Sequence, residues 1–188
     1  MADILCLKGD AAFSAFRLQR LQARLVAAVS DIESVVADYW HVVAQKRALN
    51  ADERAKLATL LEEKAAGSEA GELFLVTPRI GTISPWSSKA TDIAWNCDLA
   101  GIERIERGIA CHVVRKDGRR LTGDERRIVA GLLHDRMTES VLADFDEAGE
   151  LFRHFPPKPL ATVDVLKGGK TALVGANGSL GLALSDDE

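Results

Sequence analysis

The residues best suited to bind an anion lie close together between positions 75 and 93. The apolar run Leu73–Val76 predicts a short buried strand, and Pro78 and Gly81 keep the following loop out of regular structure. Ser84 before Pro85 is typical of a helix N-cap with proline at the first helical position. Since a helix N-terminus has free N–H groups, this segment is expected to hold a phosphate or a carboxylate. The side chains that favour this are Arg79, Thr82, Ser84, Ser87, Ser88 and Lys89.

Three more side chains qualify as substrate-binding or interface residues. Trp86 lies inside the polar loop, where an aromatic ring more often anchors an interface than fills a core. His134 and Arg136 follow an expected helix that ends near Leu133. A cation at a helix C-terminus with a nearby salt bridge is an equally good explanation for them. Both interpretations stay open: these two residues bind substrate or a partner domain, or they stabilise only the helix end.

The cysteines and histidines do not have the spacing of a catalytic or metal site. The three cysteines are odd in number and lie in apolar patterns, which is typical of small buried hydrophobes. His41 and His112 occupy similar places in two expected strands, without the further ligands that a metal pair needs. We therefore expect no catalytic residue, no disulfide and no metal site in this chain. The cysteines are Cys6, Cys97 and Cys111.

Composition is that expected of a soluble cytoplasmic protein. A hydrophobic fraction of 47% is enough to fill a core, and a formal net charge of −4 gives no reason to expect nucleic acid or an anionic membrane as partner. Every apolar run is far shorter than the roughly 20 residues of a membrane span. The start Met1-Ala2-Asp3-Ile4 has neither the basic residues nor the cleavage site of a secretory signal.

The chain contains an internal repeat with a period of about 70 residues, the size of a small α/β unit rather than of a solenoid repeat. Each copy has the pattern of strand, helix, strand, helix and strand. Asn50 with Glu53, and Thr122 with Glu125, have the spacing of a capping box at equivalent helix starts. The matched segments are Ile32-Glu33 with Ile102-Glu103, His41-Val42-Val43 with His112-Val113-Val114, and Asp52-Glu53-Arg54 with Asp124-Glu125-Arg126.

The expected fold class is α+β, with duplicated units forming antiparallel sheets and helices on one face. Side chains alternate along the second long strand, with Arg104 and Glu106 on one side and Ile105 and Ile109 on the other. This alternation is typical of an antiparallel sheet covered on one face. The expected strands cover residues 4–7, 32–43, 73–77 and 102–114, and the expected helices contain Leu25, Leu57, Ile93 and Leu132.

The pattern changes after Glu150, so we divide the chain into a duplicated domain at 1–150 and a second region at 151–188. Three prolines between positions 156 and 159 exclude a helix or a central strand and predict an extended linker. A short strand is expected at 161–166 and a helix, weakened by glycines, at 171–184.

Four segments spread along the chain resemble one enzyme family. They are Ser14–Arg17, the loop Leu75–Ile93, the run Leu133–Glu139 and the closing Leu180–Glu188. Together they are similar to the N-terminal region of large, single-chain phosphoribosylformylglycinamidine synthase. This resemblance implies a fused dimer of the small separate subunit found in multi-component forms of that enzyme. It also implies that 151–188 begins a truncated linker domain, and that the chain is a fragment.

By resemblance, the full enzyme is a purine-biosynthesis ligase that makes formylglycinamidine ribonucleotide from formylglycinamide ribonucleotide, with ATP, magnesium and ammonia from glutamine. The resemblance implies synthetase and glutaminase domains of the same full-length chain as partners, and no cofactor and no activity for this fragment alone. We expect a scaffold that packs on the synthetase domain and helps to form the substrate or ammonia path. The alternative is a non-catalytic module that only docks domains together.

Overall fold

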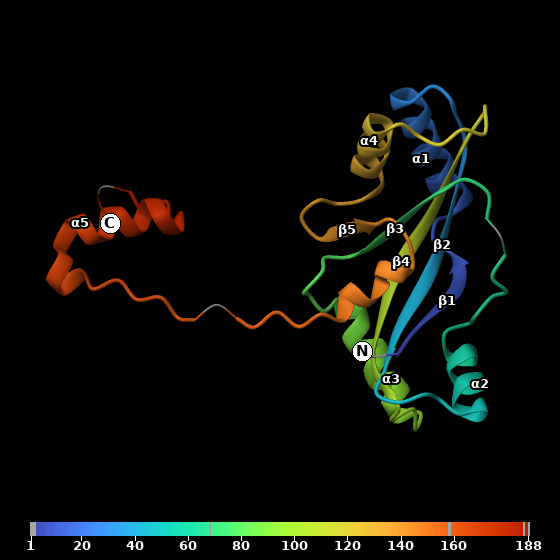
Figure 1. The fold of residues 1–188 in the computed structure, drawn as a ribbon, viewed down its shortest axis with the longest axis horizontal. Coiled ribbons are helices and arrows are strands. Elements are labelled where there is room, and N and C mark those ends of the chain that lie inside the picture. Colours follow the sequence, from blue (N-terminus) through green and yellow to red (C-terminus); the bar gives the residue numbers. More distant parts are fainter. Residues whose placement is uncertain (1–2, 68, 158, 186, 188) are drawn as a thin grey trace. The chain divides into compact units, whose positions relative to one another are not determined.

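The computed structural model describes residues 3–67, 69–157, 159–185 and 187 (Figure 1). These residues divide into two compact units, one that ends at His154 and one that begins at Phe155. The first unit extends four residues beyond the boundary expected at 150, because a 3₁₀ helix, η1 at Asp146–Phe152, packs on the sheet.

The first unit is built on a single sheet of five strands. The strand order is β1-β2-β4-β3-β5, and every neighbouring pair is antiparallel. The two long central strands pair along almost their whole length, from Ile32 opposite Arg115 to Gln45 opposite Ile102. The strands are β1 at Asp3–Ala11, β2 at Ile32–Gln45, β3 at Glu72–Pro78, β4 at Ile102–Arg115 and β5 at Glu139–Leu142.

Four helices cover one face of this sheet, which confirms the expected α+β class and its one-sided arrangement. Each begins with a side chain that accepts a backbone N–H, and both capping boxes predicted from sequence form, at Asn50 and at Thr122. Proline follows the Ser84 cap of the third helix. The helices are α1 at Ala15–Ala28, α2 at Ala51–Leu60, α3 at Pro85–Asn96 and α4 at Gly123–Leu133.

Two apolar clusters on the helical face reflect the duplication. In one, α1 of the first copy packs beside α4 of the second, over Val35 and Val113. In the other, α2 of the first copy shares its core with α3 of the second, over Val43 and Ile105. Figure 1 shows these two helix pairs at opposite ends of the sheet. Each copy therefore completes its core with a helix from the other copy.

The strand register corrects one detail of the repeat. Val35 and Val43 of β2 correspond to Ile105 and Val113 of β4, since each pair lies on the helical face in equivalent clusters. His41 is on this same face, where it contacts Trp86 of α3. His112 alternates with Val113 and lies on the opposite face, so the expected equivalence of His41 and His112 is wrong. A gap misplaced by one residue moves every side chain of a strand to the other face.

The face of the sheet opposite the four helices is covered in part by η1. Leu151 and Ala148 of η1 are buried there against Val42 and Leu75. Phe145, just before η1, contacts Trp40 with the ring centroids 4.2 Å apart. This coverage explains why Val42 of β2 and Ala110 of β4 are buried even though no α-helix lies over them.

The apolar side of α3 differs from the expected one. Ile93 is 49% exposed, whereas Ala94, Thr91 and Ser87 are buried against β4. Cys97 ends the helix and is half-buried rather than part of a core stripe. The reason is that α3 lies along an uncovered edge of β4, where small and polar side chains contact the backbone, as described below.

The second unit contains one helix, α5 at Val165–Leu180, within its described residues. Residues 161–163 are not a strand, and the helix begins six residues earlier than expected because Asp164 caps it by accepting the Lys167 N–H. Gly169, at φ 56°, kinks its first turn. Asp186 and Glu188 of the closing motif lie outside the described residues. No helix in the described ranges has the length and apolar character needed to cross a membrane.

Candidate functional site

The loop between β3 and α3 is held in place by its own side chains. Thr82 donates both its N–H and its hydroxyl to the Arg79 carbonyl oxygen, at 3.1 and 2.6 Å, which closes a tight turn. Gly81 in this turn has φ 84°, a conformation that favours glycine. The Arg79 N–H donates to the Thr138 carbonyl oxygen at 2.9 Å. Two segments that carry the family resemblance, 75–93 and 133–139, therefore meet here.

A buried carboxylate lies at the start of α3. Glu106 of β4 is 1% exposed and accepts hydrogen bonds from the Ser84 hydroxyl, at 2.8 Å, and the Ser84 N–H, at 3.2 Å. The same hydroxyl oxygen accepts the Ser87 N–H at 3.0 Å. An anion of the chain itself thus occupies this helix N-terminus, which places Ser84 in a structural role as cap and anchor.

The helix α3 also satisfies the edge of β4 that β3 leaves uncovered. β3 pairs with residues 109–113 of β4, so the backbone before Ile109 has no strand on that side. The Thr91 hydroxyl accepts the Ile105 N–H at 3.0 Å, and the Trp95 indole donates to the Ile102 carbonyl oxygen at 2.9 Å. These contacts replace ladder hydrogen bonds and fix α3 beside the first part of β4.

Arg107 is the cation that this arrangement brings into the middle of the site. Its guanidinium lies 4.2 Å from the ring centroid of Tyr39 and 4.7 Å from that of Trp86. Two aromatic rings therefore hold it by cation–π contacts. Within the described residues its guanidinium has no hydrogen bond or ion pair to a protein acceptor. The N–H donors of Arg107 are free to bind an anion.

His41 lies behind this arginine as a neutral imidazole. It is 7% exposed, pairs with Arg107 across the two central strands and stacks on Trp86 at 5.4 Å between ring centroids. Gly9 of β1 leaves room for it, because a Cβ at that position would come 2.9 Å from His41 Cε1. Burial, and then the positive charge of Arg107, lower the pKa of His41 to about 4. A neutral ring next to Arg107 adds no second positive charge to the site.

The loop and the strands enclose a cavity of about 550 Å³, in the size range of small-molecule sites. Arg107 and Tyr39 form one wall, and the loop residues Arg79, Thr82 and Ser84 form another. The remaining side is closed by the segment after α4, with Met137, Thr138 and Glu139. The cavity thus combines two arginines and two hydroxyl side chains of the loop.

The other residues predicted from sequence lie around this cavity rather than in its wall. Trp86 supports Arg107 from behind. Ser87 is fully buried on the inner side of α3, where its hydroxyl oxygen has no hydrogen-bond partner among the described residues, and Ser88 is exposed. Lys89 lines a separate apolar groove of about 170 Å³ between α2 and α3. The expected group of cations and hydroxyls is therefore divided between two surfaces.

His134 and Arg136 follow α4 and flank the cavity without lining it. His134 is the C-cap residue of α4, and its Nδ1–H donates to the Ala130 carbonyl oxygen. Arg136 is exposed. Asp135 accepts the Met137 N–H at 2.8 Å, which shapes the turn that brings Met137 and Thr138 to the cavity. The segment after α4 therefore reaches the cavity through Met137 and Thr138, whereas the side chains of His134 and Arg136 do not line it.

Sequence reasoning missed Arg107, Tyr39 and Glu106. The sequence did contain a sign of Arg107. It lies between Ile105 and Ile109 on the helical face of β4, where an apolar residue is expected. A lone charge on a buried face requires a partner or a function. Nothing local indicated Glu106, because its partner Ser84 lies far away in sequence.

Among the described residues, no group of three or more His, Cys, Asp or Glu side chains is arranged to hold a metal ion. Burial raises the pKa of Cys6 to about 11 and that of Cys111 to about 12. These two thiols stay protonated at neutral pH, which is the opposite of what a nucleophile needs.

The model of one protein family, formylglycinamide ribonucleotide amidotransferase N-terminal, matches residues 38–152. This match covers more than half of the chain. The chain belongs to this family. The match begins one residue before Tyr39 and ends at the last residue of η1, so it contains every residue that lines the 550 Å³ cavity. Membership of this family confirms the resemblance to the N-terminal region of phosphoribosylformylglycinamidine synthase that the four sequence segments indicated.

Proposed function

We propose that this chain is the N-terminal domain of the glutamine- and ATP-dependent ligase that converts formylglycinamide ribonucleotide to formylglycinamidine ribonucleotide in the cytoplasm. Family membership supports this assignment. The synthetase and glutaminase domains of the same full-length chain are the proposed partners, and ATP and magnesium act there. The raised thiol pKa values of Cys6 and Cys111 favour a structural role for both residues, so the chain alone is proposed to be inactive.

The proposed role of the cavity is to bind an anionic group of the substrate and orient it toward the synthetase domain. The observation that carries this proposal is Arg107, a guanidinium held between Tyr39 and Trp86 with its hydrogen-bond donors free. Because the two rings restrict its position, Arg107 loses little conformational freedom when it binds a phosphate or carboxylate. Arg79, in another wall, adds a second cation, and Thr82 fixes the turn that carries it by donating its hydroxyl to the Arg79 carbonyl oxygen.

A second candidate role is domain docking, and the groove between α2 and α3 favours it. Leu60 and Ile93 line this groove and are 38% and 49% exposed. Lys89 lies at its rim, close to Trp86. Exposed apolar side chains beside a groove are typical of a protein interface. The two roles are compatible, because the groove and the cavity lie on either side of the α3 N-terminus.

The three tryptophan indoles give a direct test of the substrate role. The ¹⁵N-labelled chain is titrated with formylglycinamide ribonucleotide, and the indole N–H signals are followed by NMR. Trp86 is expected to shift because it contacts Arg107, whereas Trp40, on the other sheet face, and Trp95, bonded to the Ile102 carbonyl oxygen, stay unchanged. The shift of Trp86 is expected to disappear in Arg107→Met.

Arg136→Met is the matched control, because it removes an exposed arginine next to the cavity without touching its wall. This variant is expected to bind as the unmodified chain does. Equal shifts of all three indoles, or the same loss of binding in both variants, would contradict the substrate role. An unresponsive Trp86 in the chain, together with loss of association to the synthetase domain in Ile93→Asp, would favour the docking role instead.

A further inference from the structure

A second, larger cavity lies at the other end of β4 from α3, where that strand leads into α4. Its volume is about 920 Å³. Four arginines line it, against the two carboxylates of Glu72 and Asp144. The four arginines are Arg115, Arg119, Arg120 and Arg126.

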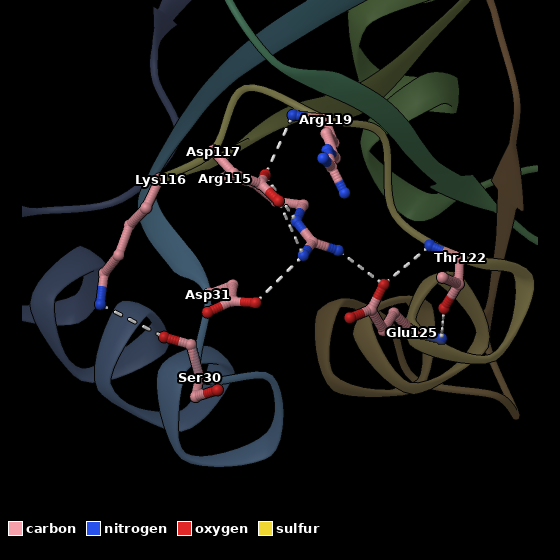
Figure 2. Close-up of polar contacts among 8 residues, drawn as sticks. All are labelled: Ser30, Asp31, Arg115, Lys116, Asp117, Arg119, Thr122 and Glu125. Atoms are coloured by element: carbon pink, nitrogen blue, oxygen red, sulfur yellow. Dashed lines mark hydrogen bonds and ion pairs between the residues drawn. The ribbon is translucent and has the colours of Figure 1, made fainter.

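Arg115 holds the wall of this cavity together through ion pairs. Its side chain is 10% exposed and forms ion pairs with Glu125 at 2.8 Å and with Asp31 and Asp117 at 3.1 Å each (Figure 2). The pKa of Glu125 is lowered chiefly by the Thr122 backbone N–H, with Arg115 contributing, so this carboxylate stays charged. With three carboxylates around it, Arg115 has little capacity left for a ligand. It ties the start of β2, the end of β4 and the start of α4 together.

Arg126 is also occupied by protein contacts. It forms an ion pair with Glu72 and lies over the Phe74 ring at 4.5 Å from the centroid. Glu72 in turn accepts the Leu121 N–H at 2.9 Å. These contacts neutralise one more arginine of the cavity and anchor the backbone that follows Arg120.

The loop that carries Arg119 and Arg120 is therefore fixed at both ends. On one side, the Gly118 N–H donates to the Arg115 carbonyl oxygen at 3.1 Å, and Gly118 has φ 67°. The Arg119 N–H donates to Asp117 at 3.0 Å, the only dashed contact drawn to Arg119 in Figure 2. On the other side, the Leu121 N–H is bonded to Glu72.

The guanidinium groups of Arg119 and Arg120 are the unpaired charges of this cavity. In the part of the chain that the structure describes, neither guanidinium forms a hydrogen bond or a salt bridge. The nearest acid in sequence, Asp117, is already engaged by the Arg115 side chain and the Arg119 backbone. Two arginines on a fixed loop, with no protein acceptor, have the donors that phosphate oxygens bind best.

We propose that Arg119 and Arg120 bind the phosphate groups of a phosphorylated small molecule in this cavity. The volume lies at the upper end of the range for small-molecule sites, so it accommodates a ligand of nucleotide size rather than a single phosphate ion. Guanidinium groups on two consecutive residues of one loop offer donors for two linked phosphates. This site shares no lining residue with the cavity at Arg107 and does not depend on the function proposed for that cavity.

The test uses three probes with the whole chain at roughly physiological salt, about 0.15 M, where weak surface attraction is screened. Inorganic pyrophosphate and ADP present two linked phosphates, and succinate presents two carboxylates. Isothermal titration calorimetry measures the Kd of each. ADP and pyrophosphate are expected to bind with similar affinity, and succinate at least about ten times more weakly, because a diphosphate carries more negative charge and more acceptor oxygens for the guanidinium donors than two carboxylates do.

The double variant Arg119→Ala with Arg120→Ala is expected to raise the Kd of pyrophosphate at least ten-fold. The matched control is Arg17→Ala with Arg24→Ala, which removes the same charge from exposed positions on α1. A circular dichroism melt of each variant checks that it is folded. The proposal is overturned if pyrophosphate does not bind, if both double variants weaken it equally, or if succinate binds as tightly. Loss of binding in the first double variant alone supports it.

Discussion

Acidification is expected to destabilise the first unit through one histidine, His41. Burial and the Arg107 charge lower its pKa in the folded chain to about 4, from an ordinary value of 6.5. Between these two values the unfolded chain binds a proton that the folded chain does not, so the stability present above about pH 6.5 is lost as the pH falls toward about 4.

The size of the effect follows from that difference. One pKa unit corresponds to about 1.4 kcal/mol, so complete titration removes about 3 kcal/mol from the free energy of unfolding. Between about pH 7.5 and about pH 5 the loss is about 2 kcal/mol, before most carboxylates begin to titrate. Since domains of this size are stable by only about 5–15 kcal/mol, such a loss is readily measured.

The assay is urea unfolding at several pH values, followed by tryptophan fluorescence, which reports only on the first unit because Trp40, Trp86 and Trp95 all lie in it. His41→Gln removes the titrating group and is expected to lack about 2 kcal/mol of the pH-dependent loss. His112→Gln is the matched control. Burial also lowers the pKa of His112. The His112→Gln variant still contains His41, so it is expected to keep the part of the pH-dependent loss of stability that His41 causes. The same pH dependence in the unmodified chain and in His41→Gln would refute the reasoning.

Three further outcomes are expected. Glu106→Ala should lower the free energy of unfolding by about 3–5 kcal/mol, because the half-buried Ser84 N–H and hydroxyl lose their charged acceptor; Glu106→Gln, which keeps one acceptor oxygen, should lose less, and equal losses in urea unfolding would argue against the carboxylate's role. Leu57→Ala should cost about 2–5 kcal/mol through a cavity at a fully buried position, whereas Ile93→Ala, at a 49% exposed position, should cost about 1 kcal/mol or less in the same assay; the reverse order would contradict the packing of α3. A crystal structure should superpose residues 32–66 on 102–138 by a rotation near a half-turn, and a different order of elements in the two segments would end the duplication argument.

Much of the fold was predictable from the sequence because its patterns are regular. The long strands are rich in β-branched and other apolar residues, and the capping boxes at Asn50 and Thr122 mark two helix starts directly. The register of the repeat was less accessible, because matching His41 with His112 by identity ignores which face each one occupies. Pairing across strands decides that face, and it depends on residues far apart in the chain.

The candidate site was predictable only in its loop. Arg79, Thr82 and Ser84 were identified from residue type and spacing, and they do line one cavity. Arg107 was not, since its meaning depends on two rings, Tyr39 and Trp86, that come from other elements. The same limit applied to α3, where an apolar stripe predicted burial of Ile93. Instead, α3 packs its small and hydroxyl-bearing side chains against β4, because the free edge of that strand needs a hydrogen-bond partner such as Thr91.

The sharing of each apolar cluster between helices of both copies also affects how fast the first unit folds. Neither half of the first unit holds a complete core, since α1 needs α4 and α2 needs α3. The central pairing of β2 with β4 joins segments made far apart in time on the ribosome, with Ile32 opposite Arg115. Chain closure over such distances slows folding, so the first copy stays incompletely folded until the second has been synthesised. The exposed apolar face of the first copy is then what a chaperone would meet during translation.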